Sequence, residues 1–260
     1  MNLQDKLARL KRKIYGYKSC LVAFSGGTDS AFLLKVCSSV LTPGKLLAVT
    51  AVSATYPKAE LEKARQLAAE IGVRLKVIRT AELSNKRFSA NPVKRCYFCK
   101  KELFTELINI ARQNKLNFVL DASNLSDKSD YRPGTIAKEE LNIKSPLVEA
   151  GFTKEDIRDL SKKLGLSSWN KPSLACLASR IPYGTRITPG LLKRIDQAEE
   201  YLIGLGFNQV RLRHYKGLCR IEVNRNDMIR LLKQQQQVVE RLKNLGYNYI
   251  TLDLEGYRQG

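Results

Sequence analysis

The 260-residue chain has no uninterrupted apolar run of the length that a membrane-spanning helix needs, about 20 residues. Its first residues also lack the apolar core of a signal peptide, because Asp5, Lys6 and Arg9 interrupt them. We therefore expect a cytoplasmic protein. In that compartment the six cysteines are expected to be thiols or metal ligands instead of disulfides.

Acidic residues are scarce, since 25 Asp and Glu stand against 45 Lys and Arg, which gives a formal net charge of +20. Such an excess attracts anions, either nucleic acid or small molecules that carry phosphates and carboxylates. The basic residues are spread along the chain, so the charge alone does not choose between these partners.

Two common phosphate-binding patterns are absent, Gly-x-x-x-x-Gly-Lys-Ser/Thr and Gly-x-Gly-x-x-Gly. Instead, an apolar run leads into Ser-Gly-Gly-Thr-Asp-Ser, and a helical pattern follows. Gly26 and Gly27 let backbone N–H groups approach an anion, and the helix adds its N-terminal dipole. Ser25, Asp29 and Ser30 lie where a phosphate and Mg²⁺ site needs oxygen ligands. The alternative is a plain Gly-Gly turn with an aspartate as helix cap.

Strands and helices alternate in the first half of the chain. Four apolar runs are predicted strands: 20–24, 46–52, 75–78 and 117–120. Helical patterns lie before and between them: 2–15, 58–71 and 97–112. This order predicts an α/β fold, a parallel sheet with helices on both faces. Because ligands of such sheets bind at the carboxyl ends of the strands, we expect one nucleotide site made by three segments: 25–30, 50–55 and 121–132.

A second, smaller domain is predicted after an irregular stretch. A helix is expected at 153–164, and residues 166–186 follow without a regular pattern. The expected elements beyond that stretch are these: a helix at 189–204, strands at 208–215 and 218–224, a helix at 226–244 and a strand at 247–253. We therefore divide the chain into a domain of residues 1–183 and a small α+β domain of residues 184–260, which would bind substrate or mediate oligomerisation.

The two short strands of the second domain predict a conflict of charge. If Lys216-Gly217 is a two-residue hairpin turn, Arg213 faces Arg220 and Arg211 faces Glu222. Two arginines directly opposite each other are unfavourable unless an anion lies between them. Two solutions remain open: a bound phosphate or carboxylate ligand, or a solvated sheet face with salt bridges.

The cysteines predict a metal site. Cys96 and Cys99 form Cys-x-x-Cys at the start of a predicted helix, and Cys176 lies in the irregular stretch. A structural zinc ion would need a fourth ligand, and His214 is the only histidine. Three thiolates suit a 4Fe-4S cluster with one open iron. The other three fall on apolar patterns and are expected to be buried: Cys20, Cys37 and Cys219.

Two other roles for the cysteines remain open. Cys96 and Cys99 are also typical of a redox pair. Cys176 alone would be a nucleophile or sulfur source if Lys171 and Arg180 make it more thiolate-like.

Two segments carry a family resemblance. Ser-Gly-Gly-Thr-Asp-Ser at 25–30 resembles the pyrophosphate-binding loop of the ATP pyrophosphatases. Together with Trp-Asn-Lys-Pro-Ser-Leu-Ala-Cys-Leu-Ala-Ser-Arg-Ile-Pro-Tyr-Gly at 169–184, it makes nearly the whole chain resemble the LarE family, the ATP-dependent sulfur transferases of nickel-pincer nucleotide synthesis. The resemblance implies the adenine nucleotide alpha hydrolase-like PP-loop fold. It also implies that ATP adenylates the carboxylates of pyridinium-3,5-biscarboxylic acid mononucleotide and that sulfur displaces AMP, twice per product.

The resemblance also implies site residues. The phosphate loop would be Ser25, Gly26, Gly27, Asp29 and Ser30, with Mg²⁺. The arginines that bind the substrate phosphate would be Arg211 and Arg213, and Ser179 and Arg180 lie beside the cysteine in the family's site segment. A metal-binding acid would be Glu199 or Glu200. One branch of the family sacrifices the cysteine that matches Cys176, and another holds an iron–sulfur cluster, here on Cys96, Cys99 and Cys176, which takes up inorganic sulfide or sulfur from a donor. Trimers that pair into hexamers are implied.

Three other functions remain open. A tRNA thiolase also combines this loop with three cysteines, and it predicts tRNA binding that weakens steeply with salt. An ATP sensor with structural zinc predicts a colourless protein and no release of AMP. An amide-forming synthetase of the NAD or GMP kind predicts that Cys96, Cys99 and Cys176 are dispensable.

Overall fold

The computed structural model describes residues 1–129, 133–171 and 176–258, and its contacts divide the chain into two units. The first unit contains residues 1–53, 58–82 and 94–174, and the second contains residues 54–57, 83–93 and 175–260. The boundary predicted at residue 184 lies inside the second unit. Each unit is described by itself.

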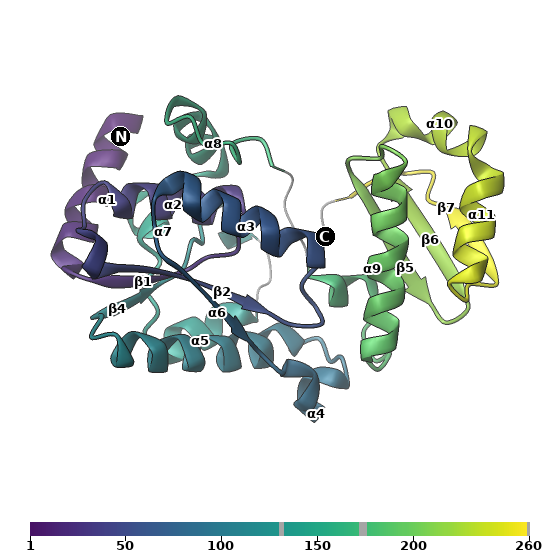
Figure 1. The fold of residues 1–260 in the computed structure, drawn as a ribbon, viewed down its shortest axis with the longest axis horizontal. Coiled ribbons are helices and arrows are strands. Elements are labelled where there is room, and N and C mark those ends of the chain that lie inside the picture. The colour runs from purple at the N-terminus through teal and green to yellow at the C-terminus, as the bar shows by residue number, and fades with distance from the viewer. Residues whose placement is uncertain (130–132, 172–175, 259–260) are drawn as a thin grey trace. The chain divides into compact units, whose positions relative to one another are not determined.

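A four-stranded parallel sheet forms the centre of the first unit (Figure 1). Its strands are β1 Cys20–Ala23, β2 Leu46–Val52, β3 Leu75–Arg79 and β4 Phe118–Leu120, in the order β3-β2-β1-β4. Each strand reads as a nearly continuous apolar run because both faces of the sheet are covered. The parallel α/β prediction is therefore confirmed.

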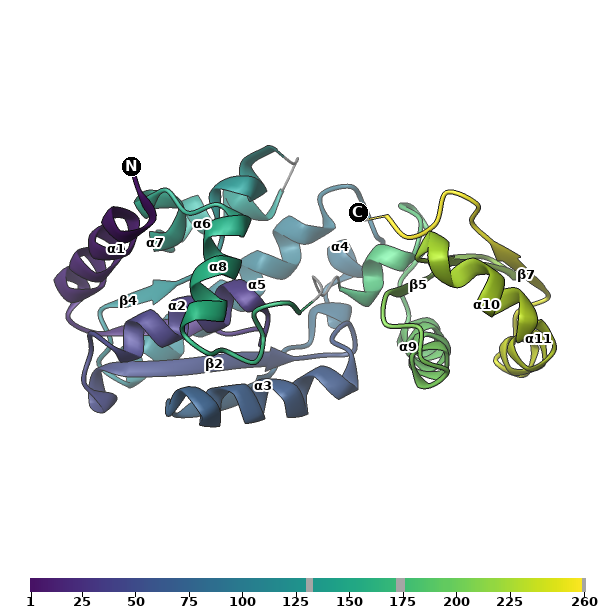
Figure 2. The same cartoon turned by 90° about the horizontal axis from the view of Figure 1, so that it is seen from above.

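Helices cover both faces of this sheet, as Figure 2 shows from above. The helices of the first unit are α1 Leu3–Tyr17, α2 Thr28–Ser38, α3 Lys58–Ile71, α5 Arg95–Gln113, α6 Gly134–Glu140, α7 Pro146–Ala150 and α8 Lys154–Lys163. Alternating side chains of β1 separate two cores: Val22 packs with α1, α2, α3, α7 and α8, whereas Leu21 packs with α5. In the described part of the chain, no helix is both long and apolar enough to span a membrane.

Helix α8 begins where the sequence places its cap. The Thr153 hydroxyl accepts a hydrogen bond from the Asp156 N–H, and the Asp156 carboxylate accepts one from the Thr153 N–H. This reciprocal capping box fixes the start of the helix. Ile157 and Leu160 then bury one face of α8 in the core that it shares with α2.

The second unit is built on a three-stranded sheet, β5 Val210–Tyr215, β6 Leu218–Val223 and β7 Tyr249–Leu252. Its helices are α4 Lys86–Ser89, α9 Pro189–Gly204, α10 Met228–Lys233 and α11 Gln235–Asn244. Strands β5 and β6 pair in antiparallel fashion with Arg213 opposite Arg220 and Arg211 opposite Glu222, so the predicted hairpin register is confirmed. Strand β7 pairs with β6 in parallel fashion.

The single helix predicted at 226–244 is wrong. The chain forms α10 and α11 with a break at Gln234, whose N–H bonds to the Leu231 carbonyl, three residues back. Leu231 and Val238 are buried, whereas the glutamines between them are polar and mostly solvated. Because tertiary packing provides most helix stability, a polar stretch without an apolar anchor permits such a break.

Segment 83–93 belongs to the second unit, because the Asn91 side chain binds backbone carbonyls of residues 181–185 in that unit. The buried Asn91 side chain donates hydrogen bonds to the carbonyls of Ile181, Pro182 and Thr185, at 3.3, 2.8 and 3.0 Å. The Ile187 N–H also donates to the Ser89 carbonyl at 2.8 Å. These bonds connect residues about 90 positions apart, a pairing that local sequence patterns do not encode.

Candidate active site

The predicted phosphate loop lies at the switch point of the sheet. Strand β1 is flanked by β2 on one side and β4 on the other, and all four strands are parallel. The carboxyl ends of these three strands are therefore neighbours, which is where open α/β sheets bind their ligands. Residues 25–30 follow β1 and begin α2, as predicted.

Contacts within the first unit define the conformation of the loop. Gly26 has a φ of +70°, and a Cβ added to it would lie 2.9 Å from the Ala64 Cβ on α3, so only glycine fits. The Ser25 and Ser30 hydroxyls lie 3.2 Å apart, and Ser30 donates to the Gly27 carbonyl at 3.1 Å. The N-terminal N–H groups of α2 and two hydroxyls are thus gathered at one place, an arrangement that suits an anion.

Asp29, in the first turn of α2, is a half-satisfied carboxylate. Its Oδ2 lies 2.6 Å from the Lys154 Nζ, whereas its Oδ1 is buried and accepts no hydrogen bond from any described residue. Burial raises the pKa of Asp29, and the Lys154 ammonium opposes that rise. An orphaned carboxylate oxygen beside a phosphate loop fits a Mg²⁺ ligand, since Mg²⁺ prefers carboxylate and phosphate oxygens.

Lys171, which lies five residues before Cys176, contacts the phosphate loop. Its Nζ lies 3.0 Å from the Gly26 carbonyl oxygen and 2.6 Å from Glu60 Oε2. The Thr28 hydroxyl donates to the Ser168 carbonyl at 2.7 Å. The ammonium that was expected to activate a thiol is therefore paired with the Glu60 carboxylate.

The segment after β4 carries a second buried carboxylate, Asp121. Burial alone would raise the pKa of Asp121, but the Lys138 ammonium and hydrogen bonds from Ser123 and Ser145 lower it below the usual value. Lys138 Nζ lies 2.8 Å from Asp121 Oδ2. The contacts of Asp121 thus join the end of β4 to Lys138 on α6 and to Ser145, the residue before α7. Residues 130–132 of the predicted nucleotide segment lie outside the described residues.

Cys96 and Cys99 lie in the first turns of α5, three positions apart and so on one helix face. Cys96 is exposed and Cys99 is partly exposed, and neither forms a disulfide. Such a pair fits two ligands of one metal centre. Among the described residues no three His, Cys, Asp or Glu side chains are gathered as a metal site. Cys176 belongs to the second unit, so the three-cysteine site stays a prediction.

The other three cysteines are buried, as predicted: Cys20, Cys37 and Cys219. Burial raises the pKa of the Cys219 thiol to about 12. These thiols are therefore core residues.

Arg180 occupies a buried ion pair four residues after the exposed Cys176. Its Nε and Nη2 donate to the two Glu199 carboxylate oxygens at 2.8 and 3.0 Å, and its Nη1 donates to the Ser179 hydroxyl at 2.9 Å. Burial alone would lower the pKa of Arg180, but the Glu199 carboxylate raises it above the usual value. Of the two candidate metal-binding acids, Glu199 is buried against Arg180 and Glu200 is exposed.

Glu222 resolves the predicted conflict between facing arginines. This fully buried carboxylate lies 2.8 Å from the Arg213 Nε and 3.1 Å from the Arg220 Nη2. The salt bridges of the second solution are thus present, although Glu222 itself is buried and not solvated, and the bound anion stays a prediction. Arg213 also donates to the Ser179 carbonyl at 3.1 Å, which brings β5 to the residues after Cys176.

Unlike Arg180 and Arg213, Arg211 forms no ion pair with a carboxylate of the described residues. It is 2% exposed, lies 4.8 Å from the centre of the Tyr257 ring and donates to the Arg258 carbonyl at 2.7 Å. Burial lowers the pKa of Arg211, and Arg180 and Arg213 add to that effect by repulsion. The second unit therefore gathers the predicted residues Ser179, Arg180, Arg211 and Arg213 at one place.

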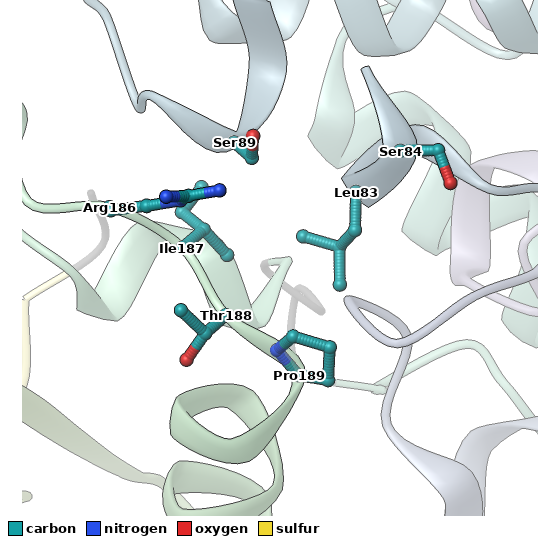
Figure 3. A pocket seen from close by; sticks show the side chains of 7 residues that line it. All are labelled: Leu83, Ser84, Ser89, Arg186, Ile187, Thr188 and Pro189. Atoms are coloured by element: carbon teal, nitrogen blue, oxygen red, sulfur yellow. The ribbon is translucent and has the colours of Figure 1, made fainter. Parts of the chain in front are cut away.

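The second unit also contains a cavity of about 340 Å³ (Figure 3). Its lining side chains come from the segments 83–89 and 186–189: Leu83, Ser84, Ser89, Arg186, Ile187, Thr188 and Pro189. Arg186 is its one charged lining residue, and none of the predicted site residues lines it.

The comparisons with known proteins agree with this arrangement. A family model described as NAD synthase matches residues 3–145, which contain the phosphate loop. The chain is 37% identical over 258 residues to the pyridinium-3,5-bisthiocarboxylic acid mononucleotide synthase of Lactiplantibacillus plantarum, covering 99% of this chain and 94% of the relative. It is 41% identical over 260 residues to an uncharacterized protein of Synechocystis, covering 99% and 97%.

A third relative, an uncharacterized protein of Methanocaldococcus jannaschii, is 30% identical over 256 residues, covering 97% of both chains. All three similarities extend through the phosphate loop, the cysteine segment and the small sheet. The chain is thus a PP-loop protein and belongs to the LarE family, the family of the bisthiocarboxylic acid mononucleotide synthase.

Proposed function

We propose that this protein converts both carboxylates of pyridinium-3,5-biscarboxylic acid mononucleotide into thiocarboxylates, with ATP as the activating substrate. The name of the Lactiplantibacillus plantarum relative states the product class, and the similarity covers both units. A carboxylate is a poor acceptor for sulfur because oxide is a poor leaving group. Adenylation gives the acyl carbon a better leaving group, AMP. The same step releases pyrophosphate, which a pyrophosphate-binding loop is suited to hold.

The observation that carries this proposal is the preformed loop at the switch point. The N–H groups at Gly26 and Gly27 and the start of α2 would hold the pyrophosphate part of ATP. Asp29, with its orphaned Oδ1, would hold Mg²⁺. When bound, Mg²⁺ neutralises negative charge on the phosphates.

The substrate mononucleotide would bind to the second unit. Arg211 and Arg213 would bind its phosphate through the guanidinium N–H groups that their bonds to the Glu222 carboxylate and to main-chain carbonyls leave over. Ser179 and Arg180 join these arginines to the segment that follows Cys176. A ligand held there would lie beside the chain that carries a candidate sulfur source.

The reaction balances as two displacements. A carboxylate oxygen attacks the α-phosphorus of ATP, which forms an acyl-adenylate and releases pyrophosphate. Sulfur then attacks the acyl carbon, the new C–S bond forms, and AMP leaves. Repeating both steps on the second carboxylate consumes a second ATP.

Cys96, Cys99 and Cys176 would provide the sulfur in one of two ways. As ligands of a 4Fe-4S cluster they would leave one iron open, and the cluster would supply sulfur at the oxidation level of sulfide. As a lone donor, Cys176 would lose its own Sγ and become dehydroalanine. Both sources require Cys176, whereas only the cluster requires Cys96 and Cys99.

The test uses anaerobically purified protein with ATP, Mg²⁺ and the dicarboxylate mononucleotide. We expect release of AMP and formation of thiocarboxylate, which mass spectrometry detects. Cys176→Ala should still release pyrophosphate and bind ATP but make no thiocarboxylate. Absence of substrate-dependent AMP release would refute the proposed ATP chemistry, and thiocarboxylate formation by the variant would refute the role of Cys176.

The two sulfur sources give different results in the same assay. If the cluster supplies sulfur, Cys96→Ser and Cys99→Ser lose iron, sulfide and activity together. If Cys176 is consumed, both variants stay active and the wild-type chain loses the mass of H₂S in a single turnover.

The formal charge of +20 specifically favours one alternative, a tRNA thiolase of the same superfamily. That function predicts thiolated nucleosides after incubation with tRNA, and binding that weakens steeply with salt. Our proposal predicts neither.

A further inference from the structure

Two cations of helix α8 act on the loop aspartate, and neither was predicted from the sequence. Lys154 is the first residue of α8, and Arg158 follows four positions later on the same helix face. The Lys154 Nζ lies 2.6 Å from Asp29 Oδ2, and Arg158 also attracts the Asp29 carboxylate.

The position of Lys154 is fixed by the fold. The capping box of Thr153 sets the start of α8, and the Lys154 N–H donates to the Ser126 hydroxyl at 3.1 Å, on the segment after β4. The Lys154 and Asp29 side chains are only 24% and 26% exposed. Lys154 therefore connects three elements of the switch point: α2, α8 and the segment that follows β4.

Unmet hydrogen bonds remain on both sides of this contact. Asp29 Oδ1 and Arg158 Nε are buried, and neither has a hydrogen-bond partner among the described residues. A buried polar atom without a partner is destabilising. An unmet carboxylate oxygen together with an unmet guanidinium donor suits a ligand that brings both a cation and an anion.

We propose that Lys154 is a resident counter-ion, which holds Asp29 until Mg²⁺ and the ATP triphosphate bind together. On binding, Asp29 exchanges the ammonium for Mg²⁺, and Lys154 and Arg158 turn to phosphate oxygens. Every charge then keeps an opposite partner. This inference rests on the proposed use of ATP and extends it to Lys154 and Arg158.

The exchange has a thermodynamic consequence, a positive coupling between the two ligands. Mg²⁺ alone must displace an ammonium that then has no partner, and ATP alone brings phosphates towards an anionic Asp29. Each ligand removes the cost of binding the other, so each raises the affinity of the other by the same factor. The loop would therefore select the Mg²⁺–ATP complex over either component.

The test measures binding by titration calorimetry with Lys154→Met and with Lys163→Met, an exposed lysine of the same helix, as matched control. Mg²⁺ is titrated alone, and ATP is titrated with Mg²⁺ and with EDTA. For Lys154→Met we expect Mg²⁺ alone to bind about tenfold more tightly than to the wild type, and the Mg²⁺ effect on ATP affinity to fall about tenfold. Lys163→Met should match the wild type.

A second background isolates the mechanism. In Asp29→Asn protein, adding Lys154→Met should leave Mg²⁺ binding unchanged, because the carboxylate that the ammonium holds is gone. If Lys154→Met fails to fold, Lys154→Gln replaces it, since its amide still donates to Asp29 but carries no charge.

Two results have different meanings. Folded Lys154→Met that binds Mg²⁺ no more tightly than the wild type and keeps the full coupling would overturn the counter-ion role. Wild-type protein that binds no ATP in the presence of Mg²⁺ would instead overturn the proposed function on which it rests.

Discussion

Replacing Gly26 with alanine should damage the loop through two separable effects. Its φ of +70° costs an L-residue about 1–2 kcal/mol. The new Cβ would also lie 2.9 Å from the Ala64 Cβ on α3, and overpacking of that kind costs about 1–3 kcal/mol. We expect Gly26→Ala to lower the unfolding free energy by the sum, about 2–5 kcal/mol.

A double-mutant cycle separates the two effects. Ala64→Gly removes the clashing methyl and costs about 1 kcal/mol by itself, because glycine is a poor helix former. In the double variant the contact between the two Cβ atoms is gone, but the Cα of position 64 would still lie 3.1 Å from the new Cβ, so part of the crowding remains beside the costs of the backbone conformation and of the helix. The two substitutions should therefore be less destabilising together than their sum, by about 1 kcal/mol.

Urea unfolding followed by circular dichroism measures these free energies. Gly16→Ala is the matched control, since an added Cβ there meets nothing within 4 Å, and it should leave stability unchanged or slightly raised. If Gly26→Ala and Ala64→Gly are additive within about 0.5 kcal/mol, the contact between loop and helix does not require glycine, which would contradict this prediction.

Three other substitutions test the buried charges. Glu222→Gln leaves Arg213 facing another arginine, so we expect a loss of about 3 kcal/mol in urea unfolding and a larger stabilisation by added sulfate than in the wild type; equal stabilisation would contradict this. Lys171→Met removes the ammonium from Glu60 and should lower the unfolding free energy by about 2 kcal/mol, a limited loss because Lys63 also contacts that carboxylate. Adding Glu60→Gln to Lys171→Met should recover part of this loss, because the unpaired carboxylate is then gone. Burial and a nearby arginine lower the pKa of His214 below its ordinary 6.5. Between the lowered pKa and about 6.5 the unfolded chain therefore binds more protons at His214 than the folded chain does, so the unfolding free energy should rise with pH up to about 6.5. His214→Gln should abolish this rise.

Local patterns were sufficient to predict the sheet and the hairpin. Continuous apolar runs marked the four buried parallel strands, because both faces of that sheet are covered. The two-residue turn at Lys216-Gly217 fixed every pair from Val210 to Val223, because the side-chain period of two leaves no freedom once the turn is placed. The phosphate loop was predictable because its glycines, its hydroxyls and its place after a strand are all adjacent in sequence.

The partners of the charged residues were not predictable in the same way. Lys154 contacts Asp29 across 125 positions, and Lys171 contacts Gly26 across 145. Nothing in the spacing of either lysine separates it from the many solvated lysines of a strongly basic chain. Glu222 lies opposite Arg211 in the register, but its carboxylate contacts Arg213 and Arg220 instead, and that choice depends on side-chain rotation within the folded sheet.

Under the proposed function, the pairing of these charges would let a chain with a net charge of +20 select among anions. Arg180 and Arg213 each hold a buried carboxylate, so neither presents a bare positive charge to every passing phosphate. A ligand must use the N–H groups that these pairs leave over, or exchange one partner for another, and both depend on geometry. Arg211, which no carboxylate of the described chain pairs with, supplies the unbalanced charge. The excess charge attracts anions in general, whereas the paired arginines would bind only anions whose shape matches the N–H groups that the ion pairs leave over.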